Sequence, residues 1–361
     1  MIQPKLSICI AVYNQINLVK QCIESILKYQ GNNIEIIVGD DCSTDNIQEM
    51  LELFSDMRIK YYRNDANLGH DMNILEMLRK CTTPYAFLLR SRDKLFGKEI
   101  PHILSYIEKY PKASYFAFSA VDELGNPVLK FSDREYAAGE DAAQAHTKIF
   151  VHPSGNLYSL KGLDFNKLQE YLSQYFQNHY AFVVHDLIRM QLIDKGTFVT
   201  SQEVVWQYTQ RKLDVAVNSA PHKISVYAPQ YQYPRYRCEI FFSIKELAGK
   251  SQKIVQRYLV KRFYKSISFD FFYENQDPKT RYHYNYDPIA FSKRKERKNF
   301  QQVSNKIFSA ALAPSRRREL KCLMCLETIL QMSWYPLKRK LIAICGSSGK
   351  MATLVKIVKD M

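Results

Sequence analysis

The chain has 361 residues, of which 46% are hydrophobic and 24% charged, and its formal net charge is +15 at pH 7. This composition excludes a disordered chain as the default, and the length allows roughly two domains. No apolar run reaches the ~18 residues of a membrane span and no signal peptide is visible, so we expect a protein that is neither secreted nor transmembrane.

Strands alternate with helices in the first quarter of the chain. Apolar runs predict strands at residues 6–12, 34–38, 59–62 and 85–89. Helical spacing of apolar residues predicts helices at 17–29, 44–54 and 70–79, the second of them capped by Thr44. These units predict an α/β fold with a parallel, doubly wound sheet and right-handed crossovers.

The periodic signal continues, more weakly, to about residue 230. We expect a helix at 100–110, a strand at 114–121, a polar, acidic loop at 131–152, helices at 163–180 and 186–195, and a last strand at 224–227. Beyond residue 240 nearly every segment has helical spacing.

The fold is organised around Tyr85 to Leu95, which reads YAFLLRSRDKL. Its first five residues are typical of a strand buried on both faces, as in the middle of a parallel sheet. Ligands of open α/β sheets bind at the carboxyl ends of the strands, so the residues that follow should line a crevice. Two guanidinium groups there would suit a phosphate. This segment contains Arg90, Ser91, Arg92 and Asp93.

Three segments, LSICIAVYNQ, EIIVGDDCSTD and RNDANLGHDMN, resemble in order and spacing the nucleotide-binding motifs of the family 2 glycosyltransferases. The resemblance covers residues 4–235, most clearly to residue 125. It implies a GT-A fold, that is, a Rossmann-like, mixed but mostly parallel sheet with helices on both faces. It also implies inverting transfer of a sugar from a nucleotide-sugar donor, with UDP as the expected nucleotide, to a lipid-linked or cell-surface polysaccharide acceptor.

The resemblance, together with the strand ends, assigns a nucleotide site. A carboxylate at the end of the second strand can accept hydrogen bonds from the polar edge of a base, so we favour Asp40 or Asp41 as a ligand over a capping role. For Asp45 we expect capping of the following helix. With the residues of the central segment, the predicted nucleotide-binding set is Val12, Tyr13, Asn14, Asp40, Asp41, Asn67, Asn73, Arg90, Ser91 and Arg92.

The central segment departs from the family pattern. Family members usually carry Asp-x-Asp here, which holds a divalent metal, whereas this chain has Arg-Ser-Arg and keeps only Asp93. One carboxylate beside two cations is a poor Mg²⁺ or Mn²⁺ site, so we expect no metal cofactor. The arginines could instead stabilise the departing diphosphate. The alternative is a non-catalytic protein that binds a nucleotide sugar or glycan on the same scaffold.

Inverting transfer needs a general base, which the family places at the start of a helix in a segment resembling TEDxxLW. Here TSQEVVW puts Glu203 at that position, and Asp186 is the second candidate, each weighed against a capping or solvated role. The resemblance also implies an acceptor side formed by Asp93, His152, Ser154 and Gly155.

The basic charge lies in the last third of the chain. Residues 231–361 contain 27 Lys or Arg and 10 Asp or Glu, net +17, interleaved with aromatic residues. We therefore expect a GT-A domain at 1–235 and a helical, basic domain at 236–361 that attaches to anionic lipid on the cytoplasmic face of the inner membrane. A solvated helical bundle is the alternative, and no nucleic-acid motif is visible.

The eight cysteines are scattered, which suits a reducing compartment. Cys322 and Cys325 form a single C-x-x-C pair. Without a second pair, this is weak evidence for zinc, and a core role is favoured.

Overall fold

The computed structural model describes residues 4–148, 152–176, 184–209 and 249–251. All of these residues belong to the first of two compact units, which consists of residues 1–223 and 244–255. The predicted domain boundary at 235–236, the expected strand at 224–227, the basic clusters and the Cys322–Cys325 pair lie outside the described residues.

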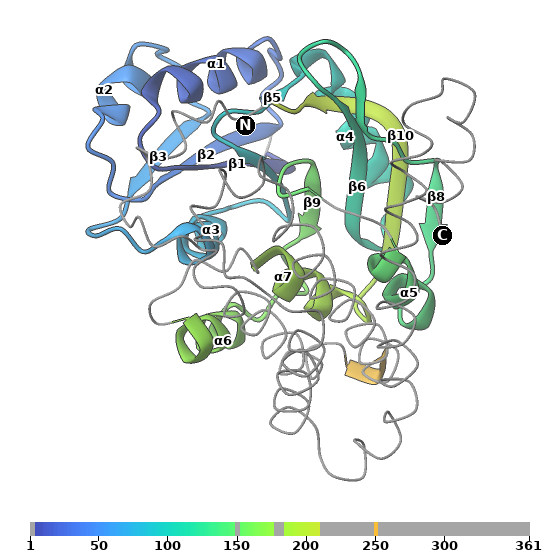
Figure 1. Ribbon diagram of the computed structural model, residues 1–361. Coiled ribbons are helices and arrows are strands. Elements are labelled where there is room, and N and C mark those ends of the chain that lie inside the picture. The colour runs from blue at the N-terminus through green and yellow to red at the C-terminus, as the bar shows by residue number, and fades with distance from the viewer. Residues whose placement is uncertain (1–3, 149–151, 177–183, 210–248, 252–361) are drawn as a thin grey trace, which may run out of the picture. The chain divides into compact units, whose positions relative to one another are not determined.

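The first half of the described unit is a parallel βα array. Its strands pair in the order β3-β2-β1-β4, and all three pairings are parallel. The bounds are β1 (Leu6–Val12), β2 (Ile34–Asp40), β3 (Ile59–Arg63) and β4 (Tyr85–Arg90), with helices α1 (Ile16–Leu27), α2 (Ile47–Glu52) and α3 (His70–Arg79). Helices α1 and α2 cover one face of these strands and α3 covers the other (Figure 1). The predicted doubly wound α/β arrangement is therefore confirmed.

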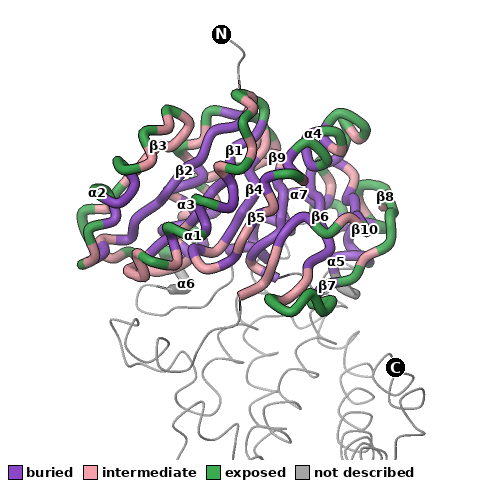
Figure 2. Tube along the Cα trace, turned by 90° about the horizontal axis from the view of Figure 1, so that it is seen from above, coloured by how far each residue is buried: buried purple, intermediate pink, exposed green. Residues whose placement is uncertain are grey.

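The sequence of each element explains its place in this array. β1 and β2 are almost entirely buried, as expected for strands covered on both faces (Figure 2). In α1 the buried residues recur at helical spacing, so one side of the helix packs on the sheet and the other faces solvent. They are Val19, Cys22, Ile23, Ser25 and Ile26.

The second half extends the same sheet with mixed pairing, in the order β4-β9-β6-β10-β5. β9 is antiparallel to both β4 and β6, whereas β6 and β10 are parallel. The strands are β5 (Lys94–Leu95), β6 (Ala113–Val121), β7 (Pro127–Leu129), β8 (Arg134–Tyr136), β9 (Asn156–Ser159) and β10 (Thr197–Gln207). The helices are η1 (Gly97–Glu99), α4 (Ile100–Lys109), α5 (Glu140–Lys148), α6 (Phe165–Phe176) and α7 (Val184–Leu192).

Two sequence-based predictions fail in this half. The expected loop at 131–152 contains β8 and α5. The expected helix at TSQEVVW is the middle of β10, an eleven-residue strand that pairs with β6 and β8. Tertiary pairing decides this segment, because its valines and threonines fit a half-buried strand as well as a helix face.

The starts of α1 and α2 differ slightly from the prediction, whereas α3 begins at His70 as predicted. Asn46, not Thr44, caps α2, and its side chain accepts a hydrogen bond from Glu49 N. Asp45 caps the preceding helix rather than the following one, because its Oδ2 accepts from Ile16 N at 3.0 Å. This contact ties the turn after β2 to the start of α1.

The core lies on both faces of the sheet. On one face, alternate residues of β1, β2 and β4 pack with α1, α2 and α4 in a continuous apolar cluster that also includes Phe116 and Phe118. On the other face, stacked aromatic rings from β6, β9 and β10 pack together at centroid separations of 4.7–5.2 Å. Within the described residues, no helix is long and apolar enough to cross a bilayer.

Candidate functional site

The carboxyl ends of β1, β2 and β4 meet at one edge of the sheet. Val12 is in register with Asp40, and Ala11 with Arg90. The predicted nucleotide-binding residues of three separate segments therefore come together, as expected for the ligand edge of a doubly wound sheet.

Asp40 ends β2 and is fully buried. One carboxylate oxygen accepts from both the backbone N (2.9 Å) and the Oγ of Ser43, and the other accepts from Tyr61 OH (2.6 Å) and Arg63 Nη1 (2.9 Å). Burial and the bond to Asp40 raise the pKa of Tyr61 to about 12. A carboxylate has about four acceptor positions, and these four donors fill them. These contacts favour a structural role for Asp40, and its role as a base ligand stays a prediction.

Asp41 is nearly as buried but has a different set of partners. Oδ1 accepts from Leu68 N at 2.7 Å and Asn64 Nδ2 at 3.1 Å, and Oδ2 accepts from Gly69 N at 2.9 Å. These bonds hold the loop that leads into α3. Burial raises the pKa of Asp41. Asp41 accepts from three donors and Asp40 from four, so of the two aspartates Asp41 is the better candidate for contacting a nucleotide base.

Three predicted nucleotide-binding residues are asparagines, and each makes hydrogen bonds within the protein. Asn73 is buried, donates to Gly39 O at 3.0 Å and accepts from Asn64, so it braces α3 against β2. Asn67 accepts from Gly69 N at 3.1 Å, and Asn14, whose φ is 56°, accepts from Thr44 N at 2.8 Å.

The first strand end carries the remaining two predicted contacts. Val12 is buried and its carbonyl accepts from Asp41 N, whereas Tyr13 is half-buried beside it. Tyr13 therefore remains the aromatic residue placed to pack against a base.

A clamp centred on Asp93 closes the end of β4. Arg90 donates to both carboxylate oxygens of Asp93, at 2.7 and 2.8 Å. Ser154 Oγ donates to Asp93 at 2.5 Å and Thr209 N donates at 2.9 Å. Asp93 is fully buried and its carboxylate is occupied by these donors, and its role as an acceptor contact stays a prediction. Its charge holds together three chain segments that are far apart in the sequence.

The predicted phosphate-binding residues do not share one environment. The Arg90 guanidinium is bonded to Asp93 and lies 5.1 Å from the centroid of the Tyr208 ring. Ser91 is buried, whereas Arg92 is half-buried. Asp93 is the single carboxylate here and is already paired with a guanidinium, so the donor set at this strand end does not fit a divalent cation.

The loop before β9 packs onto the end of β10. The His152 ring stacks on Trp206 at 5.1 Å, and its Nδ1 accepts from Ser154 N. Burial, and then the charge of Arg90, lower the pKa of His152 to about 3. His152 is thus neutral at physiological pH, and because Nδ1 accepts, its proton lies on Nε2.

Gly155 is the tightest position of this loop. Its φ is +82°, and a Cβ would lie 2.0 Å from Trp206 Nε1. Ser154, next to it, accepts from Arg90 N at 2.9 Å besides donating to Asp93. Ser154 and His152 thus contact the residues at the end of β4, or the rings beside them, from inside the protein; we call this region the β4 corner. Trp206 stacks on His152 and Tyr208 lies beside Arg90, and the sequence analysis did not identify either of them as part of this site. Only the pairing of β10 with β6 reveals them.

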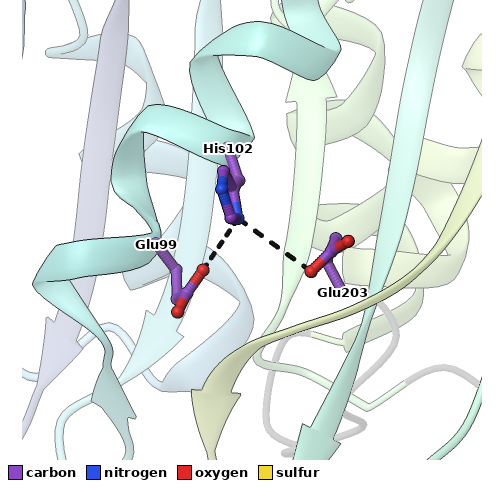
Figure 3. Close-up of side chains that lie close together, drawn as sticks. All are labelled: Glu99, His102 and Glu203. Atoms are coloured by element: carbon purple, nitrogen blue, oxygen red, sulfur yellow. Dashed lines mark ion pairs between the residues drawn. The ribbon is translucent and has the colours of Figure 1, made fainter.

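Glu203 lies in the middle of β10, where it has no partner residue on β6. This bulge leaves its side chain 42% exposed. Figure 3 shows it facing His102 and Glu99, which come from α4 and the turn before it. His102 Nδ1 lies 2.8 Å from Glu99 and 3.9 Å from Glu203. Among the described residues these three form the group whose ligand atoms, all within 4.8 Å of one another, could hold a metal ion.

This group is set back from the ligand edge. Glu203 lies four positions before Gln207 at the end of β10, about 13 Å at the usual rise of a strand. The prediction that Glu203 begins a helix is therefore wrong, because Glu203 lies within a strand. Glu203 is also distant from the end of β4, where Asp93 lies.

Asp186, the second predicted base, is in the first turn of α7. It is buried and forms an ion pair with the equally buried Arg189. Its neighbour His185 lies 5.9 Å from the His70 ring at the start of α3, and burial lowers the pKa of His185 to about 3. The pairing of Asp186 with Arg189 favours a structural role.

Known sequences match mainly the first half of this unit. Residues 7–164 match the family described as Glycosyl transferase family 2. Abequosyltransferase RfbV of Salmonella typhimurium is 30% identical over 108 residues, 28% of this chain and 32% of the relative. A Campylobacter jejuni protein named GalNAc(5)-diNAcBac-PP-undecaprenol beta-1,3-glucosyltransferase is 24% identical over 229 residues, 57% of this chain and 72% of the relative. Three curated relatives of 30–33% identity are matched over only 18–32% of their own length.

Solved structures share the fold. Residues 1–349 of S. aureus TarS, determined with UDP-GlcNAc, align with a TM-score of 0.56 at 14% identity, covering 91% of this chain and 89% of that one. At this identity the likeness concerns the fold alone. The sheet has the GT-A Rossmann-like architecture that the sequence predicts, and the family match covers residues 7–164.

Proposed function

We propose that this protein transfers a sugar from a nucleotide-sugar donor to a glycan or lipid-linked acceptor. The observation that carries the proposal is the family match over residues 7–164, whose strands β1, β2 and β4 end together at the edge where Asp41 and Arg92 lie. TarS was solved with UDP-GlcNAc, and the name of the Campylobacter relative includes a polyprenyl diphosphate. By analogy, we propose that the donor of this protein is a UDP-sugar and that its acceptor is a lipid-linked glycan or a surface polysaccharide.

We further propose that the transfer proceeds with inversion and needs no divalent metal. The departing diphosphate requires cationic stabilisation. Arg90 already neutralises Asp93, which removes the carboxylate that a metal would need. Arg92 and the free edge of the Arg90 guanidinium would then supply positive charge to the phosphate oxygens.

Isothermal calorimetry with UDP, with and without EDTA, tests this directly. We expect equal affinity in both conditions. Arg92→Ala should weaken binding by roughly 10-fold or more, because a charged hydrogen bond contributes about 1.5–3 kcal/mol. Arg134→Ala, which removes an exposed arginine on β8, is the matched control and should bind normally. Loss of UDP affinity in EDTA would contradict metal independence.

Of the two predicted bases, Glu203 has the accessible carboxylate and Asp186 is paired with Arg189, so we propose Glu203 as the general base. Because Glu203 is set back from the end of β10, this proposal requires the acceptor hydroxyl to bind beside Glu203. Glu203→Gln should lower kcat by roughly 10²-fold while donor affinity stays unchanged. Asp186→Asn should mainly lower stability. If Asp186→Asn abolishes turnover in a protein that remains folded, the base assignment moves to Asp186.

The net charge of +17 over residues 231–361 supports attachment to an anionic membrane surface. Sedimentation of the full chain with liposomes tests it. Binding should rise with anionic lipid content and fall, but not vanish, in high salt, since interleaved aromatic residues would remain inserted. Equal binding to zwitterionic vesicles would contradict the proposal.

A binding protein without turnover is the second candidate. The ion pairs of Asp186 with Arg189 and of Asp93 with Arg90 favour it, because a carboxylate held in an ion pair is less able to act as a general base or to bind a metal. UDP-sugar binding without hydrolysis or transfer to any acceptor extract would support this candidate.

A further inference from the structure

Two cysteines from distant parts of the chain lie side by side in the parallel half of the sheet. Cys9 Sγ and Cys81 Sγ are 3.3 Å apart and separated by 72 positions in the sequence. Cys9 is in β1 and fully buried, between Ile37 of β2 and Leu88 of β4. Cys81 follows α3 immediately after its C-cap, Lys80, and is half-buried.

Neither thiol has a strong competing partner. The remaining contacts of the two sulfurs are long ones to carbonyl oxygens, from Cys9 to Ser7 at 3.9 Å and from Cys81 to Met77 at 3.8 Å. The other described cysteines, Cys22 and Cys42, are free. Cys22 is buried in α1, and Cys42 contacts the carbonyl of Asp65 at 3.7 Å.

The pair lies at the end of the sheet opposite the candidate site. The start of α3 is tied to Asp41 at the carboxyl edge through Gly69, so the end of α3 points to the amino edge. Next to Cys81, Thr82 N donates to Glu35 at 2.7 Å, and Glu35 is the second residue of β2. A bond between the two sulfurs would therefore leave the nucleotide-facing loops in place.

We propose that Cys9 and Cys81 form a reversible disulfide when the protein meets a hydroperoxide. Cys81, the more accessible thiol, reacts first: its thiolate attacks the peroxide oxygen, the O–O bond breaks, and the alcohol leaves, giving a sulfenic acid. The Cys9 sulfur then attacks the Cys81 sulfur, the S–O bond breaks and water leaves. Two thiols and one hydroperoxide thus give one disulfide, one alcohol and one water.

The required movement is small. The sulfurs must close from 3.3 Å to about 2.05 Å, and Cys81 lies just beyond α3, where its backbone N makes a single long bond to Leu78 O at 3.3 Å. The bond would close a loop that contains α1, β2, α2, β3 and α3. Cross-linking this loop restricts the unfolded chain and so stabilises the parallel half of the unit.

Tryptic mapping of the full chain tests the proposal. Cleavage after Lys and Arg places Cys9 on residues 6–20 and Cys81 on residues 81–90, apart from every other cysteine. Reduced protein is treated with hydrogen peroxide, remaining thiols are alkylated with iodoacetamide, and the digest is analysed by mass spectrometry. We expect the linked peptide 6–20/81–90, lighter than its two parts by two hydrogen atoms, as the major product. Dithiothreitol should reverse it, and the thermal midpoint of the oxidised protein should be higher by several degrees.

Two variants sharpen the test. Cys81→Ser should abolish the linked peptide and the thermal shift, whereas Cys42→Ser, the matched control, should keep both. Alkylated Cys9 together with sulfinic or sulfonic acid at Cys81 after peroxide treatment would overturn the proposal, and so would a bond from either cysteine to a different one. The mapping of the unsubstituted chain decides the question even if a variant fails to fold.

Discussion

The carboxylates at the end of β2 (the β2 corner) and after β4 (the β4 corner) accept hydrogen bonds from donors at very different distances along the chain. At the β2 corner, the carboxylates of Asp40 and Asp41 accept from donors between residues 43 and 69, all within the next thirty positions of the chain. At the β4 corner, Asp93 accepts from Ser154 and Thr209, which are 61 and 116 positions away. The first corner is local and the second joins three distant segments.

This difference has consequences for stability and for function. A local corner can form as soon as β2, β3 and the start of α3 are in place. The distant corner exists only when β9 and β10 have joined the sheet, so the Asp93 carboxylate links the end of β4 to the segments beside those two strands. Changes at Asp93 should therefore cost more than equivalent changes at Asp41.

Asp93→Asn should have the largest effect. The substitution leaves the Arg90 guanidinium, only 19% exposed, without its counter-charge, and breaking a buried pair in this way costs about 3–5 kcal/mol. Urea unfolding of the variant and the parent protein measures it. A loss below about 1 kcal/mol would show that the distant corner is not held by this charge.

Gly155→Ala tests the same corner through packing instead of charge. The new Cβ would lie 2.0 Å from Trp206, and the positive φ of +82° is unfavourable for alanine, so we expect a loss of about 3 kcal/mol. Gly125 has nearly the same φ, +81°, with nothing within 4 Å of its Cβ position. Gly125→Ala isolates the backbone cost, about 1 kcal/mol. Equal losses in the two variants would remove the packing argument.

Asp41→Asn probes the local corner. The amide keeps the shape and one acceptor oxygen but weakens the charge-assisted bonds to Leu68 N and Gly69 N, which should cost about 1–2 kcal/mol in urea unfolding. If UDP affinity also falls while Asp40→Asn leaves affinity per folded molecule unchanged, Asp41 contacts the base. A cost as large as that of Asp93→Asn would contradict the contrast between the corners.

The smallest expected effect is a pH dependence at the distant corner. His152 has a folded-state pKa of about 3, below its ordinary value of 6.5, so the unfolded chain binds a proton that the folded one refuses. Stability is therefore lost as pH falls from 6.5 towards 3, by about 1 kcal/mol for this residue at one unit below 6.5. His152→Phe keeps the ring and should reduce the difference between unfolding free energies at pH 7.5 and 5.5 by that amount. An unchanged difference would show that His152 is not neutralised by its surroundings.

Residue patterns alone predicted much of the parallel half. Short apolar runs bounded by polar turns identify β1 to β4 within a residue or two. For β1, β2 and β4 the reason is that strands buried on both faces must be apolar, whereas β3 is only partly buried. The same reasoning predicts a ligand edge at the carboxyl ends of these strands, whereas the replacement of an acidic pair by Arg90 and Arg92 stays a prediction from the family resemblance. Parallel βα units repeat a local rule, so local sequence is enough to predict them.

Tertiary structure decided the rest, for a physical reason that recurs at each position. TSQEVVW forms a strand because β6 pairs with it on one side, and β8 pairs with Thr200 and β5 with Trp206 on the other, which no window of seven residues contains. Asp40 and Asp41 have similar sequence surroundings, yet only their donors show that the first is saturated. Asp93 links distant segments because it accepts hydrogen bonds from Ser154 and Thr209, which are 61 and 116 positions away in the sequence. Composition and periodicity determine which segments can be strands or helices, whereas the role of a buried charge depends on partners that only the folded chain brings within reach.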